Sequence, residues 1–138
     1  MPPCVLAHSD LDRAVAEAAA SEPVVLAACV FGSRARDEAR TGSDLDVAVL
    51  ETPGRTLSLE AEDRLRRAIA RATSLPVDLA RLGPARPVLA FEVLQGGRRV
   101  FAHGAEQADE QQERLLRRYL DTEHLRRVQR GYLLGAEE

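Results

Sequence analysis

The chain contains no lysine, and all 19 of its basic residues are arginine. Any basic side chain that contacts a phosphate must therefore be a guanidinium, which can bind two oxygens at once. Cysteine is nearly as scarce: Cys4 and Cys29 stand far apart, without the paired spacing of a zinc site or a disulfide framework. This scarcity favours a reducing compartment, and we expect a cytoplasmic protein.

Long apolar runs are also missing. No stretch reaches the roughly 18 residues that a membrane-spanning helix needs, and residues 1–8 lack the basic start and long apolar run of a signal peptide. Positive charge is not in excess, because the formal net charge is −3. That balance argues against a protein that holds nucleic acid through bulk electrostatics. We expect neither a membrane nor a direct nucleic-acid partner.

The chain has 138 residues, which suggests one domain with a modest core. Apolar runs and amphipathic segments alternate along it, which indicates an α+β (α/β-like) sheet with packed helices. In one amphipathic segment, Leu65, Ile69 and Ala72 line the apolar face. The expected strands are residues 24–31, which include a buried Cys29, 44–50, 77–82 and 98–102. The expected helices are residues 9–20, 33–40, 58–74, 86–95 and 106–133, the last being one helix or two.

The most informative segment links two of the expected strands. Gly32-Ser33 leaves the first apolar run, and Asp44-Leu45-Asp46 opens the second. Because side chains alternate along a strand, Asp44 and Asp46 point to one face while Leu45 points into the core. Two carboxylates on one face suit a partial magnesium site that substrate phosphates complete.

A third aspartate has the same parity in the next strand. Val77 and Leu79 face one side and Asp78 the other, so neighbouring strands would gather Asp44, Asp46 and Asp78. Three such carboxylates repel one another unless metal neutralises them. Two metal ions could then activate an attacking hydroxyl and stabilise the leaving oxygen of an in-line displacement at phosphorus.

The Gly-Ser pair supplies a candidate phosphate grip. Gly32 allows close backbone approach, and Ser33 adds a hydroxyl beside the N–H groups of the following turn. Arg34 could reach a terminal phosphate, whereas Arg36 is better explained as a solvated helix residue. A Gly-Ser pair or an Asp-x-Asp alone is usually a turn or a solvated strand end, so the combination carries the prediction.

These residues resemble the nucleotidyltransferase signature of the DNA polymerase β-like superfamily. Gly32-Ser33, ten intervening residues and Asp44-x-Asp46 match it, and the third carboxylate falls on Asp78. The surroundings "GSRAR", "SDLDVAVL", "LPVDLARL", "RVFA" and "YLD" are similar to minimal nucleotidyltransferase (MNT) domains, especially the MntA-type antitoxins paired with HEPN-domain toxins.

The resemblance implies a nucleotidyltransferase fold: a mixed β-sheet with helices packed on one side and a long C-terminal helix. It divides the chain into a core, residues 1–104, and a helical extension of the same domain, residues 105–138. The implied activity is Mg²⁺-dependent transfer of AMP from ATP to a tyrosine of a HEPN ribonuclease toxin, which silences it.

The resemblance also implies roles for individual residues. Gly32, Ser33 and Arg34 would bind the nucleotide, and Asp44, Asp46 and Asp78 would be catalytic and hold two Mg²⁺ ions. One departure is Asp37, where many relatives have glycine, because it adds negative charge near the triphosphate.

Two other functions stay open at this point. The protein could be a non-catalytic, nucleotide-binding antitoxin that covers its partner, since the apolar stripe of the last helix shifts register near His124. Its two parts are Leu115, Leu116, Tyr119 and Leu120, then Leu125, Val128 and Tyr132. The protein could also modify a small molecule, although few residues follow the core to hold one. His8, His103 and His124 lack metal-ligand spacing, and Arg98 and Arg99 are expected to flank a strand.

Overall fold

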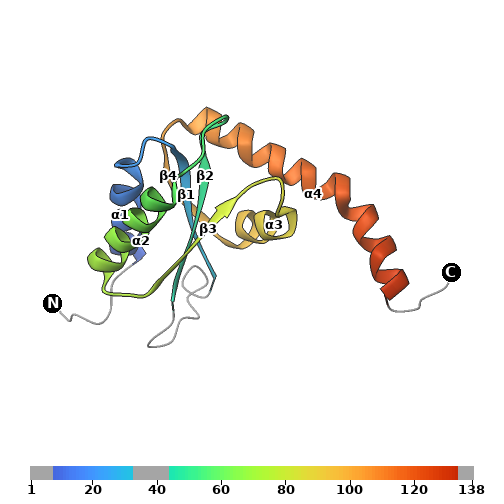
Figure 1. The fold of residues 1–138 in the computed structure, drawn as a ribbon, viewed down its shortest axis with the longest axis horizontal. Helices are drawn as coiled ribbons and strands as arrows, with labels where there is room; N and C mark the ends of the chain where they lie inside the picture. Colours follow the sequence, from blue (N-terminus) through green and yellow to red (C-terminus); the bar gives the residue numbers. More distant parts are fainter. Residues whose placement is uncertain (1–7, 33–43, 134–138) are drawn as a thin grey trace.

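The computed structural model describes residues 8–32 and 44–133. In this part of the chain four strands and four helices follow one another, and the strands form one sheet (Figure 1). The elements are α1 (His8–Ala20), β1 (Val25–Phe31), β2 (Leu45–Glu51), α2 (Leu59–Thr73), β3 (Val77–Leu82), α3 (Pro87–Gly96), β4 (Arg98–Ala102) and α4 (Ala105–Leu133). The helix expected over residues 33–40 lies outside the described residues, and the other expected elements are confirmed to within one residue at each end.

The sheet has the strand order β3-β2-β1-β4. β1 pairs antiparallel with both β2 and β4, whereas β2 and β3 are parallel. The mixed sheet is therefore confirmed. The two central strands are buried along almost their whole length, because helices cover both faces, and this is why β1 reads as a continuous apolar run.

Each face of the sheet carries its own core. Val47 and Val49 of β2 point toward α1 and α2, whereas Ala48 and Leu50 point toward α3 and α4. The expectation of helices on one side holds for α1 and α2 only. The opposite face is covered by α3 and the first half of α4, through Ala90 and Val93 of α3 and Ala108 and Leu115 of α4.

Helix α2 shows how local sequence sets an element's ends. The Ser58 hydroxyl accepts a hydrogen bond from the Ala61 N–H at 3.0 Å, and Ser74 ends the helix in the left-handed conformation at φ 59°. Leu65 and Ile69 are buried as expected, but Ala72 is exposed. The buried stripe runs through Thr73 instead, whose hydroxyl donates to the Ile69 carbonyl at 2.8 Å.

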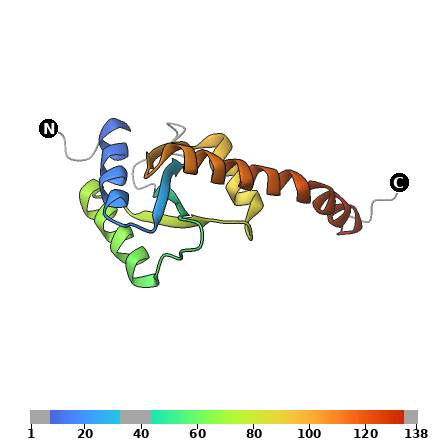
Figure 2. The same ribbon diagram turned by 90° about the horizontal axis from the view of Figure 1, so that it is seen from above.

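Helix α4 is a single helix that leaves the body of the molecule, as Figures 1 and 2 show. Near its middle, Tyr119 stacks on Phe91 of α3 with ring centroids 4.1 Å apart. The Arg126 guanidinium lies 4.0 Å from the Tyr119 ring centroid. Beyond this contact Leu125 and Val128 are exposed, so the second half of α4 has little intramolecular cover.

Two general expectations concern the described residues as a whole. No helix within residues 8–32 and 44–133 is long and apolar enough to cross a membrane. Cys29 is buried in the core of the sheet as expected, whereas Cys4 lies outside the described residues.

Candidate active site

The three aspartates lie at one end of the β2–β3 pair. Asp44 immediately precedes β2, Asp46 is its second residue, and Asp46 is the register partner of Asp78 in β3. Neighbouring strands lie about 4.8 Å apart, and partners in register point to the same face. The alternation therefore places all three residues on the face that α3 and α4 partly cover.

The exposure of the three residues differs. Asp44 and Asp78 are exposed, whereas Asp46 is half-buried. The face on which they lie continues through Ala48 into the apolar core under α3. The carboxylates thus lie at the edge of this core, where two of the three are in contact with solvent.

Gly32 lies directly against Asp46. It follows Phe31, the register partner of Asp46 in β1, and has a φ of +75°. A Cβ atom built on Gly32 would lie 2.1 Å from the Asp46 Oδ2 atom. Glycine is therefore required for two reasons: the positive φ disfavours other residues, and a side chain would collide with the Asp46 carboxylate. The structure thus brings Gly32, at the end of β1, against the Asp46 carboxylate of β2.

Part of the expected site lies outside the described residues. Ser33 and Arg34, expected to bind the nucleotide, fall there, as do Arg36 and Asp37. Their expected roles stay predictions.

The aspartates fit a partial metal site by their chemistry. Within residues 8–32 and 44–133, no three His, Cys, Asp or Glu side chains are grouped so that they could hold a metal ion. Magnesium does not need such a cage, because it takes one or two carboxylates together with water and substrate phosphates. Asp44 and Asp46, with Asp78 beside them, are donors of the right kind.

The other polar candidates have structural partners. Arg98 contacts Asp12 of α1 with a shortest N–O distance of 2.9 Å, and Arg99 contacts Asp109 of α4 at 2.8 Å. The two arginines are the first two residues of β4 and so lie within the strand instead of flanking it. They point to opposite faces of β4 and join helices to it.

Sequence reasoning missed two polar contacts that link α2 to other parts of the fold. The nearly buried Glu22 carboxylate accepts from the Arg64 Nε and Nη2 atoms at 2.7 and 2.9 Å. Arg81 of β3 bridges Glu62 of α2 and Glu51 at the end of β2. Arg81 is three residues after Asp78, so alternation along the strand predicts that it points to the opposite face of the sheet. The local sequence does not indicate which residues it contacts there.

Comparison with known proteins adds a family model and a set of solved structures. The model described as "Polymerase beta, Nucleotidyltransferase" matches residues 8–106. Among curated proteins, none matches the chain.

Several solved structures share the fold. One from Shewanella oneidensis is 18% identical, with 93% of this chain and 99% of that chain covered and a TM-score of 0.73. A chain from a toxin–antitoxin structure with AMP-PNP is 22% identical, with 90% and 95% covered and a TM-score of 0.71. A third, from a tri-AMPylated Shewanella oneidensis HEPN toxin in complex with an MNT antitoxin, is 23% identical, with 89% and 92% covered and a TM-score of 0.66.

Proposed function

This chain belongs to the polymerase β nucleotidyltransferase family, and on that premise we propose that it is an antitoxin that transfers AMP from ATP to a tyrosine of a HEPN-domain toxin. The observation that carries the proposal is the close approach of Gly32 to Asp46, which is in register with Asp78. Gly32, which begins the expected phosphate grip, lies against carboxylates that suit magnesium. The proposal places the protein in the cytoplasm.

The residues divide the chemistry between them. The Gly32 backbone, with Ser33 and Arg34, would hold the triphosphate, and Asp44, Asp46 and Asp78 would hold Mg²⁺. When bound, two such ions would neutralise the carboxylates and the developing phosphate charge. Asp78 would accept the proton of the tyrosine hydroxyl. The tyrosine oxygen then forms a bond to the α-phosphorus as the bond to the bridging oxygen breaks, and pyrophosphate leaves.

The similar structures support the choice of substrate and partner. One was determined with AMP-PNP and another with an AMPylated HEPN toxin. This chain covers 95% and 92% of the matched chains, so the likeness extends over nearly the full length of each of them.

The proposal is tested by incubating the protein with α-labelled ATP, Mg²⁺ and the HEPN toxin encoded beside it. Asp46→Asn should lower the rate of label transfer at least about 100-fold, since metal stabilisation of the transition state is worth several kcal/mol. Asp63→Asn is the matched control, because Asp63 lies on α2, across the sheet from the site. The absence of transfer by the wild-type protein, or equal rates for both variants, would refute the proposal.

A second function, neutralisation by covering the toxin, is favoured by one specific observation. Leu120 and Leu125 of α4 are each 61% exposed and Val128 is 42% exposed. An amphipathic helix of this kind can lie in an apolar groove of a partner. Under this alternative, Asp44→Asn combined with Asp46→Asn would still neutralise the toxin, whereas Leu125→Glu combined with Val128→Glu would not.

A further inference from the structure

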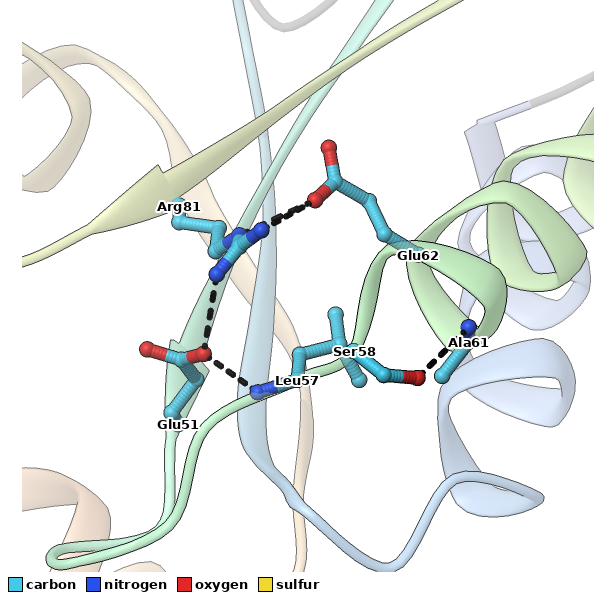
Figure 3. A network of polar contacts seen from close by, with 6 residues as sticks. All are labelled: Glu51, Leu57, Ser58, Ala61, Glu62 and Arg81. Carbon is cyan, nitrogen blue, oxygen red and sulfur yellow. Dashed lines mark hydrogen bonds and ion pairs between the residues drawn. The ribbon is translucent and has the colours of Figure 1, made fainter.

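A polar network ties the far end of β3 to β2 and α2 (Figure 3). The Arg81 Nη2 and Nε atoms lie 2.7 and 3.0 Å from the Glu62 Oε1 atom, and the Nη1 atom lies 3.5 Å from the Glu51 Oε2 atom. Glu51 also accepts a hydrogen bond from the Leu57 N–H at 2.6 Å. The guanidinium therefore joins a strand end, a helix and the loop between them.

Arg81 and Asp78 lie on opposite faces of the same strand. Asp78 is the register partner of Asp46, and Arg81 is the register partner of Val49, which points toward α1 and α2. The network thus acts from the face that carries no candidate catalytic residue. The side chains of Arg81, Glu51 and Glu62 are only 31%, 22% and 28% exposed, so solvent screens their attraction less than it would at the open surface.

The apolar pattern of β3 leaves its register weakly specified. β3 is an edge strand of the described sheet, and only Leu82 is buried in it. A slip of one residue would turn Asp78 to the wrong face, which the half-buried Val77 and Leu79 oppose. A slip of two residues would preserve the faces but move Asp78 about 6.6 Å along β2.

Arg81 opposes that second slip directly. The same slip would displace the Arg81 backbone by about 6.6 Å along β2. The guanidinium would then leave Glu51 and Glu62, and two half-buried carboxylates would lose their ion-pair partner. We propose that Arg81 is a positioning residue that holds β3 in the register at which Asp78 stands opposite Asp46. The inference rests on the proposed function where it concerns catalysis, and on the sheet alone where it concerns register.

Arg81→Met tests the inference, with Arg99→Met as the matched control. Arg99 lies on the other edge strand, is 26% exposed, and also bridges two acceptors, Asp109 at 2.8 Å and Gln112 at 2.6 Å. Two readouts are needed. The first is amide hydrogen exchange, and the second is the ratio of the ATP dissociation constants without and with Mg²⁺, which reports on the spacing of the carboxylates.

In Arg81→Met we expect faster exchange in residues 77–82 and about a tenfold loss of the Mg²⁺-dependent gain in ATP affinity, since misplaced groups lose much of their effect. Arg99→Met should affect β4 only. Arg81→Lys keeps the positive charge but loses the planar group that contacts two carboxylates, so both readouts should lie between those of the wild type and Arg81→Met. This variant replaces Arg81→Met in the test if Arg81→Met does not fold.

Two outcomes overturn the inference: Arg81→Met leaves both readouts at wild-type values, or Arg99→Met changes them equally. If the wild-type protein shows no Mg²⁺-dependent ATP binding, the proposed function fails, and the exchange of β3 alone decides the role of Arg81.

Discussion

Gly32→Ala separates the geometry of the site from the stability of the fold. Gly32 has a φ of +75°, and an added Cβ would lie 2.1 Å from the Asp46 Oδ2 atom. Cβ atoms essentially never approach another atom closer than 3.0 Å. The turn or the carboxylate must therefore move by at least about 0.9 Å, the difference between these two distances.

The two consequences have different magnitudes. An alanine in the left-handed region costs about 1–2 kcal/mol, which lowers the melting temperature of a chain of this size by roughly 3–8 °C. Movement of a catalytic group by about 1 Å costs on the order of 100-fold in rate. We therefore expect Gly32→Ala to fold and to lose AMP transfer by about two orders of magnitude.

Gly54→Ala is the control for the backbone term. Gly54 has a φ of +80°, and a Cβ atom there would meet nothing within 4 Å. It lies in the turn after β2, at the end of the strand remote from Asp46. In a thermal melt Gly54→Ala should show the backbone cost alone, and Gly32→Ala should lose at least that much because its Cβ also displaces Asp46. Only Gly32→Ala should lose transfer of labelled AMP. Full activity of Gly32→Ala, or an equal loss in Gly54→Ala, would refute the reasoning.

Three further changes probe other parts of the molecule. Ser74→Gly should raise the free energy of unfolding by about 0.5–1 kcal/mol in urea titrations, because Ser74 ends α2 at φ 59°. Burial raises the pKa of the Cys29 thiol from 9.0 to about 11, so between these pH values the unfolded chain loses a proton that the folded chain keeps. Stability should therefore fall as pH rises through that window, and Cys29→Ala should make the fall shallower in urea titrations from pH 8 to 11. Leu125→Glu with Val128→Glu should change the free energy of unfolding by less than about 0.5 kcal/mol, because both side chains are exposed. Under the alternative in which α4 contacts the HEPN toxin, the same double variant should weaken binding at least about tenfold in calorimetry. Unchanged affinity would show that this surface does not contact the toxin.

Most of the fold is encoded in patterns that are local in the sequence. β1 is a continuous apolar run because helices cover both faces, and the alternation of Asp46 with its apolar neighbours marks β2. The start of α2 follows from Ser58, whose hydroxyl caps the helix. Each of these features needs only neighbours along the chain, so the sequence alone could predict it.

The arrangement of elements around the sheet depends on distant contacts. The placement of α3 and α4 on the second face follows from packing of Val93 and Leu115 against the sheet, and a single apolar stripe does not say which face it will meet. The sequence predicts a buried Ala72, but the buried residue at this point of α2 is Thr73. Its burial is possible because its hydroxyl donates a hydrogen bond to the Ile69 carbonyl of the same helix. Apolar character therefore predicts burial only on average.

The candidate site shows the same division. The faces of Asp44, Asp46 and Asp78 follow from alternation along a strand, but their meeting requires that β3 be the parallel neighbour of β2 in one register. That register is selected on the opposite face, where Arg81 meets Glu51 and Glu62. The aspartates belong to a recognisable sequence motif, whereas Arg81 does not, because its proposed role is structural and not catalytic. Its partners lie 30 and 19 residues away in the chain, so the position of the third carboxylate is a property of the folded sheet and not of the motif.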